Sequence, residues 1–209
     1  MKKFDPGLYF ITDSSAYSEE EFLCRVEKAL MGGVTLMQLR EKEKTTREYI
    51  TLAKKVHTIA KKYGVPLIID DRVDVAMAMG AEGVHLGQSD MEIGTARKIL
   101  GDDVIIGATA KTVEQALEAC AGGADYLGVG AIYPTTTKVK TIITSTEMLE
   151  KICRAVPIPV NAIGGLNKDN LQVLNGIPIA GICAVSAIMK ADDPMVAARE
   201  LREAAKSIF

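Results

Sequence analysis

The chain has 209 residues, of which 48% are hydrophobic and 25% are charged, and its formal net charge is −2. This composition is ordinary for a soluble globular protein with a substantial core. The small net charge and the few aromatic residues (no Trp, four Phe, six Tyr) argue against nucleic acid or an anionic membrane as a partner. No apolar run is as long as a membrane span, so we expect neither a transmembrane helix nor a signal peptide.

Short apolar runs alternate with amphipathic segments along the whole chain. Near-continuous apolar runs bounded by glycine or polar residues predict strands that are buried on both faces. The predicted strands are 8–11, 34–39, 65–69, 83–86, 104–106, a run that opens at 126 and is closed by Pro134, 158–163 and 180–185. The predicted helices are 19–31, 46–63, 73–79, 94–100, 112–121, 146–155, 168–174 and 194–208.

The helix boundaries rest on capping signals. Ser18 precedes the first helix with Glu21 three places on, which is the pattern of an N-terminal capping box. Gly32 and Gly33 then end that helix. Gly64 ends the second helix in the same way.

Eight strand–helix units predict an α/β fold in which a (β/α)8 TIM barrel forms one domain over residues 1–209. The alternative is an open doubly wound sheet, for which we would expect a glycine-rich fingerprint after the first strand. Residues 11–14 offer none. In a barrel the carboxyl ends of all strands point to one face, so the polar residues that follow the strands are expected to form a single site.

Two carboxylates stand out among these strand ends. Asp71 and Asp90 follow neighbouring strands, and a pair of hard oxygen ligands with open positions suits Mg²⁺. The alternative is that each is the N-terminal acid of a helix, since Arg72 and Met91 begin helical stretches.

Cations form the second group. Arg40, Lys42 and Lys138 supply more positive charge than a small neutral substrate needs. With the carboxylates they suggest a diphosphate, and a second anion near Gly165, Ser186 and the hydroxyls of residues 135–137. Taken alone, the stretch 134–138 is also what a polar surface turn after a core strand would look like.

The four cysteines, Cys24, Cys120, Cys153 and Cys183, form neither a CxxC pair nor a metal-like cluster. We interpret them as reduced, mostly buried, small hydrophobic residues of a cytoplasmic protein. Neither histidine is near a cysteine in sequence, which argues against a catalytic thiol. His57 is expected at a helix surface, and His85 lies inside a predicted strand.

Several ordered motifs resemble the thiamine phosphate synthase family. They are residues 9–13 (YFITD), 33–42 (ending QLREK), 69–72 (IDDR), 83–90 (GVHLGQSD), 123–126 (GADY), 133–138 (YPTTTK), 163–165 (IGG) and 184–188 (AVSAI). The set spans nearly the whole chain. The resemblance implies a transferase of thiamine biosynthesis that joins an aminopyrimidine methyl diphosphate to a thiazole phosphate, giving thiamine phosphate and pyrophosphate.

The resemblance also implies roles for residues. Asp71 and Asp90 would bind Mg²⁺, for which Mn²⁺ can substitute, and Arg40, Lys42 and Lys138 would be catalytic. The implied substrate-binding residues are Gln38, Leu39, Arg40, Glu41, Lys42, Asp70, Thr109, Thr135, Thr136, Thr137, Lys138, Gly165, Val185 and Ser186. The stretch 38–42 and Lys138 would hold the pyrimidine diphosphate, whereas residues 135–137, 165, 185 and 186 would line the thiazole phosphate site.

The chain departs from the family pattern at three positions and in one loop. Asp70 stands where the family usually has asparagine, Thr109 where serine is usual, and Lys111 where histidine is common. Residues 139–146 lack the acidic and glycine residues often found there. The threonine keeps a hydroxyl, whereas Asp70 adds a negative charge beside the expected metal.

Three other functions stay open at this point. A thiazole tautomerase belongs to a related branch, but that branch carries a histidine near the place of Lys111. A catalytically silent barrel could bind thiamine phosphate or a precursor. A Schiff-base aldolase could use Lys138. The sequence also leaves open whether the chain forms a homo-oligomer.

Overall fold

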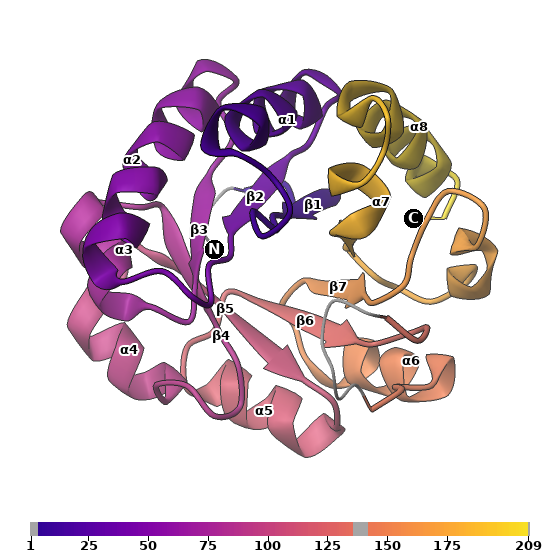
Figure 1. The fold of residues 1–209 in the computed structure, drawn as a ribbon. Helices are drawn as coiled ribbons and strands as arrows, with labels where there is room; N and C mark the ends of the chain where they lie inside the picture. Colours follow the sequence, from indigo (N-terminus) through magenta and orange to yellow (C-terminus); the bar gives the residue numbers. More distant parts are fainter. Residues whose placement is uncertain (1–3, 136–141, 209) are drawn as a thin grey trace.

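The computed structural model describes residues 4–135 and 142–208. Their strands form one closed barrel in the order β1-β2-β3-β4-β5-β6-β7-β8, and every neighbouring pair is parallel. Figure 1 shows the helices as an outer ring around these strands. The predicted TIM barrel is confirmed.

The strands are short and almost entirely buried. They are β1 (Leu8–Ile11), β2 (Leu36–Leu39), β3 (Leu67–Asp70), β4 (Gly83–Leu86), β5 (Ile105–Ala110), β6 (Tyr126–Gly130), β7 (Val160–Ile163) and β8 (Gly181–Ala184). Successive side chains on a strand point to opposite faces. In β1, Tyr9 and Ile11 therefore belong to the cluster inside the barrel, and Leu8 and Phe10 pack against the helices.

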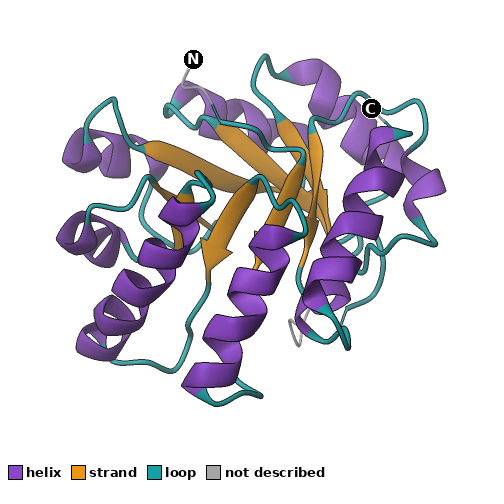
Figure 2. Cartoon of the chain, turned by 90° about the horizontal axis from the view of Figure 1, so that it is seen from above, coloured by secondary structure: helices purple, strands orange, loops and turns teal. Residues whose placement is uncertain are grey.

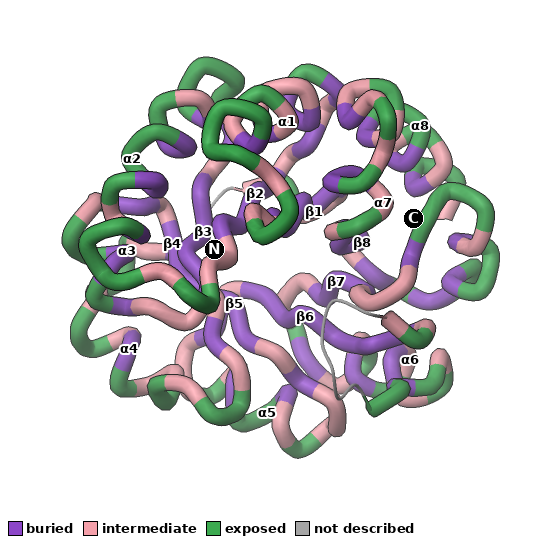
Figure 3. The backbone as a smooth tube through the Cα atoms, in the orientation of Figure 1, coloured by how far each residue is buried: buried purple, intermediate pink, exposed green. Residues whose placement is uncertain are grey.

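The helices follow the strands in sequence and cover the barrel from outside (Figure 2). They are α1 (Glu19–Met31), α2 (Thr46–Lys62), α3 (Val73–Met79), α4 (Ile93–Leu100), α5 (Val113–Ala121), α6 (Thr146–Ala155), α7 (Ser186–Met189) and α8 (Pro194–Lys206), with a 3₁₀ turn η1 (Leu171–Leu174). Their buried faces point inward and their exposed faces outward, as the alternating colours along each helix in Figure 3 show.

Side-chain caps explain where several helices begin. The Ser18 hydroxyl accepts a hydrogen bond from the Glu21 amide at 3.2 Å, as the sequence predicts. Thr45 and Glu48 form a reciprocal capping box at the start of α2. Such caps satisfy amide groups that have no partner inside the helix and so fix the starting residue.

Four predictions need correction, and one helix was missed. Of the four cysteines, which were expected to be mostly buried, only Cys183 is buried, and Cys24 is exposed. The predicted helix 168–174 is only the 3₁₀ turn η1, and α7 directly after β8 was not predicted. Strand β5 extends to Ala110, so Thr109 lies within a strand rather than beyond it. His57 is 7% exposed rather than at the surface, and its Nε2 contacts the Glu82 carboxylate at 2.9 Å.

No helix of the described part is both long and apolar enough to cross a membrane.

Candidate active site

A cavity of about 470 Å³ opens where the strands end. Most of the predicted site residues line it, although they come from strands far apart in sequence. Those that do are Gln38, Arg40, Lys42, Asp70, Asp71, Asp90, Thr109, Thr135, Gly165, Val185 and Ser186. The barrel thus brings the polar strand ends to one place, which is the location of sites in this fold.

Two predicted substrate contacts do not line the cavity. Leu39 is fully buried, and its carbonyl accepts a 2.6 Å hydrogen bond from the Tyr49 hydroxyl. The Glu41 carboxylate turns instead toward Ser14, whose hydroxyl donates to it at 2.8 Å. Burial raises the pKa of Glu41. Thr136, Thr137 and Lys138 lie outside the described residues, as do positions 139–141 of the loop.

The cations on one side of the cavity are already paired with carboxylates. Lys42 Nζ lies 2.7 Å from Asp70 Oδ2 and also contacts Asp71, and Arg40 Nε lies 3.7 Å from the same Asp70 oxygen. Burial opposes the charge on Lys42, but these two carboxylates raise its pKa above the ordinary value. Burial and the nearby Asp71 raise the pKa of Asp70, and the two cations oppose that shift. The result is a compact group of alternating charges.

The backbone places the two proposed metal ligands. Asp71 has a left-handed backbone with φ of 59°, and its amide donates to the His85 carbonyl at 2.9 Å. This conformation is uncommon outside glycine, and such strain is characteristic of functional sites. Asp90 Oδ2 accepts a 2.6 Å hydrogen bond from the Gly87 amide. Partial burial and the neighbouring Asp71 raise the pKa of Asp90.

Neither carboxylate belongs to the N-cap residue of a helix. Helix α3 has Arg72 as its N-cap without a side-chain cap bond, and α4 has Glu92 in the same role. Asp71 and Asp90 both precede these N-cap residues and lie outside the two helices.

The donor set fits Mg²⁺. Among the described residues, no three His, Cys, Asp or Glu side chains are arranged to enclose a metal ion. Asp71 and Asp90 are a pair of hard oxygen donors beside an open cavity. Mg²⁺ is commonly bound by one or two carboxylates and completes its shell with substrate phosphate and water.

The opposite side of the cavity is built from β7 and β8. Gly165 has φ of +67°, and a Cβ atom there would lie 2.6 Å from Tyr133 Cβ. Only glycine fits this turn, which lets the backbone approach the cavity. Val185 and Ser186 follow at the end of β8, where α7 begins.

His85 contributes to the cavity in a way that the sequence did not reveal. Its Nδ1 lies 3.1 Å from the Tyr126 hydroxyl and its Nε2 lies 3.0 Å from Thr109 Oγ1. Tyr9 and Cys183 line the cavity as well. Burial raises the pKa of the Cys183 thiol, which keeps it protonated. Tyr9, His85 and Tyr126 fall within motifs of the family resemblance, but nothing in the sequence indicated that they contact one another.

Fold and site together define a (β/α)8-barrel enzyme whose cavity combines cations with paired carboxylates at the strand ends. Comparison with known proteins gives the particular family. Residues 8–188 match the family described as thiamine monophosphate synthase. The chain belongs to this family.

Similarity to individual proteins supports the same family. The chain is 52% identical over 186 residues to thiamine-phosphate synthase 2 of Streptococcus pneumoniae serotype 4, covering 89% of each protein. It is 46% identical over 200 residues to the thiamine-phosphate synthase of Clostridium tetani, covering 96% of each. The solved structure of thiamine phosphate pyrophosphorylase from Pyrococcus furiosus is 40% identical, with a TM-score of 0.89 over 98% of each chain.

Proposed function

We propose that the enzyme joins 4-amino-2-methyl-5-(diphosphooxymethyl)pyrimidine to 4-methyl-5-(2-phosphooxyethyl)thiazole and releases pyrophosphate. One observation carries the proposal beyond family membership. Arg40 and Lys42 share a single cavity with the Asp71 and Asp90 carboxylates, which is the charge arrangement that a metal-bound diphosphate requires. The product is thiamine phosphate.

The bond changes require little from the protein. The CH₂–O bond of the pyrimidine substrate breaks, and its electron pair leaves with the diphosphate oxygen. The lone pair of the thiazole nitrogen then forms the new C–N bond to the same CH₂ carbon. No protein nucleophile and no strong base takes part. The site must instead stabilise the departing negative charge and hold the two rings together.

The chain's own residues divide these tasks. Arg40 and Lys42 contact the diphosphate and stabilise the charge that grows as it leaves. Lys138, which lies outside the described residues, stays a predicted third cation for the diphosphate. Mg²⁺ bound by Asp71 and Asp90, or Mn²⁺ in its place, would supply further positive charge to the diphosphate.

The thiazole phosphate occupies the other side of the cavity. Thr135 offers a hydroxyl, and Gly165, Val185 and Ser186 form the wall there. This arrangement separates the two anionic groups and leaves the rings to meet between them. The partners of the enzyme are thus two small molecules, and we place the reaction in the cytoplasm.

Product formation with omission controls tests the proposal. Purified enzyme should form thiamine phosphate, identified by mass, only when both precursors and Mg²⁺ are present. Isomerisation of a thiazole precursor without C–N bond formation would contradict it and favour a tautomerase. Tight binding of both precursors without product would also contradict it and favour a silent binding protein.

A further inference from the structure

A continuous chain of hydrogen bonds crosses the barrel interior beside the cavity. Gln38 Nε2 donates to the Tyr9 hydroxyl at 2.7 Å, and the Tyr9 and Tyr126 hydroxyls are 2.7 Å apart. The Tyr126 hydroxyl lies 3.1 Å from His85 Nδ1, and His85 Nε2 lies 3.0 Å from Thr109 Oγ1. These five side chains come from β2, β1, β6, β4 and β5, so the chain connects most of the barrel.

The two tyrosines are the buried centre of this chain. Tyr9 is 1% exposed and Tyr126 is fully buried. Burial raises the pKa of both phenols, which therefore stay protonated. Gly107 makes room for the Tyr126 ring, since a Cβ atom at residue 107 would lie 2.1 Å from its Cζ. Because a buried hydroxyl without a partner costs about 1–3 kcal/mol, neither proton can turn away independently.

When His85 is neutral, this chain of hydrogen bonds can therefore take only two directions. A phenol has one proton to donate, so a hydroxyl that accepts from one neighbour donates to the next. With Gln38 as the donor, Tyr9 donates to Tyr126 and Tyr126 donates to Nδ1 of His85. His85 then carries its proton on Nε2 and donates to Thr109. In the reverse direction Gln38 presents its amide oxygen to Tyr9 as the acceptor, His85 carries its proton on Nδ1, and Thr109 donates to Nε2.

The direction decides what Thr109 can do in the cavity. If Thr109 accepts from His85, its own hydrogen can be donated to a ligand. If Thr109 donates to His85, that hydrogen is already used. A donor whose direction is fixed before the ligand arrives stabilises developing negative charge without a cost of reorientation.

We propose that Tyr9 and Tyr126 are positioning residues that transmit the donor direction from Gln38 to His85, so that the Thr109 hydroxyl donates to the bound diphosphate. The inference rests on the proposed function only for the identity of that anion. The hydrogen-bond direction itself is a property of the free protein, and it can be measured without substrate.

Nitrogen-15 NMR of histidine-labelled protein measures this direction, because it shows which ring nitrogen of His85 carries the proton. The protein has only two histidines, so the signal that a His57→Asn variant retains is that of His85. At one pH above the usual imidazole titration range, wild-type His85 should carry its proton on Nε2. Gln38→Glu, whose carboxylate only accepts, should move the proton to Nδ1.

The tyrosines are tested by combining substitutions. In Gln38→Glu/Tyr126→Phe protein the His85 proton should no longer respond to residue 38. Tyr9→Phe breaks the chain at a different link and serves if the Tyr126 variant does not fold. Tyr17→Phe is the matched control, because its hydroxyl donates to the Met189 carbonyl at 2.6 Å, outside this chain. A wild-type His85 with its proton on Nδ1, or an undiminished response without Tyr126, would overturn the proposal.

Kinetics supplies the second readout. Tyr126→Phe should lower kcat about three- to tenfold, the scale of one hydrogen bond, with an unchanged KM for the thiazole phosphate. Unchanged kcat would overturn the role of the chain in turnover. Failure of the proposed function is distinguishable, because wild-type enzyme would then form no product while the NMR result still stood.

Discussion

The ammonium group of Lys42 lies 2.7 Å from Oδ2 of Asp70, inside the cavity rather than on the outer surface. Arg40 Nε is 3.7 Å from the same oxygen. A diphosphate that binds these cations must compete with a carboxylate that already holds them. The family resemblance implies an asparagine at this position, and an uncharged amide would not compete for the cations in this way.

Asp70→Asn should tighten the pyrimidine diphosphate and give equal or higher activity. The amide no longer repels the diphosphate, and Lys42 keeps its contact with Asp71. Since the Lys42 side chain is 37% exposed, solvent screens the pair, and we expect a change in KM of about two- to fivefold. Mg²⁺ dependence should weaken modestly. Steady-state kinetics with each substrate varied would measure both. Lost activity with unchanged Mg²⁺ affinity would refute this account and indicate that Asp70 is a protonated donor.

Asp71→Ala or Asp90→Ala should lose at least a hundredfold in rate, on the order of 3 kcal/mol, because the ligands act mainly in the transition state. Asp90 also accepts a hydrogen bond from the Gly87 amide at 2.6 Å. Asp90→Asn is the matched control, since it keeps an acceptor oxygen for Gly87 and removes the charge. Circular dichroism should show folded protein in each case. Full activity in EDTA, or an Asp71→Ala protein that does not fold, would contradict the metal assignment.

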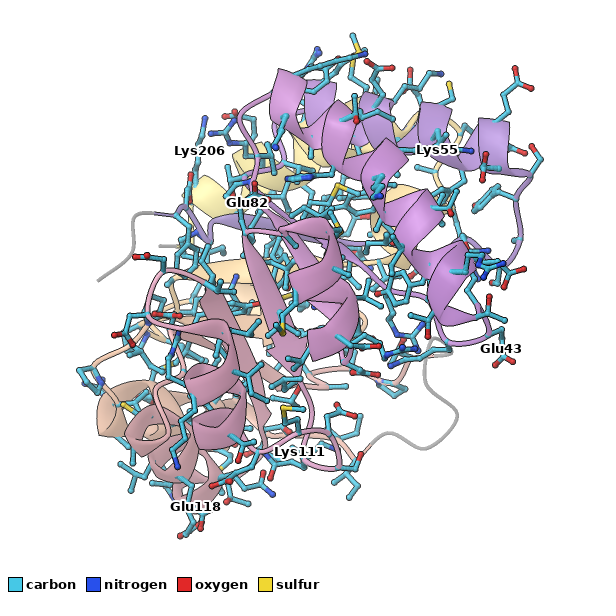
Figure 4. The ribbon with its side chains drawn as sticks, turned by 90° about the vertical axis from the view of Figure 1, so that its left-hand side faces the viewer. Glu43, Lys55, Glu82, Lys111, Glu118 and Lys206 are labelled. Carbon is cyan, nitrogen blue, oxygen red and sulfur yellow. The ribbon has the colours of Figure 1, made fainter. Side chains whose placement is uncertain are left out.

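Arg40→Ala should impair use of the pyrimidine diphosphate far more than binding of the thiazole phosphate. A charge-assisted contact to phosphate contributes roughly 1.5–3 kcal/mol, which corresponds to a ten- to hundredfold effect. Lys55→Ala is a suitable control, because Lys55 lies on the exposed side of α2 and pairs with Glu19 at 2.5 Å (Figure 4). Calorimetry would measure each ligand separately. Weakening of the thiazole partner alone would reverse our assignment of the two anion sites.

Glu82→Ala should destabilise the fold without changing turnover. The Glu82 carboxylate, labelled in Figure 4, accepts from His57 Nε2 at 2.9 Å and from the Leu67 amide at 3.0 Å. Removing it leaves a buried imidazole and a strand amide without their acceptor, so we expect about 1–3 kcal/mol less stability. Glu82→Gln keeps one acceptor and should lose less. Urea unfolding would test this, and a lower kcat at unchanged stability would contradict a purely structural role.

The sequence was sufficient for the barrel because its strands are apolar runs separated by strong helix caps and glycine stops. The same reasoning located the cavity, since polar residues such as Arg40 and Asp71 directly follow those runs. It did not identify Tyr126, because a phenol inside an apolar run cannot be distinguished from ordinary core by pattern alone. His57 was misplaced for a related reason. His57 lies on α2, whereas its partner Glu82 directly precedes β4, and only the fold brings the two side chains together.

The most direct test of the central claim is a phosphorus NMR time course of the wild-type enzyme with both precursors and Mg²⁺. The account predicts that inorganic pyrophosphate and thiamine phosphate appear in equal amounts and at the same rate, because each C–N bond formed releases one diphosphate. Pyrophosphate release without thiamine phosphate, or release of orthophosphate in its place, would contradict it.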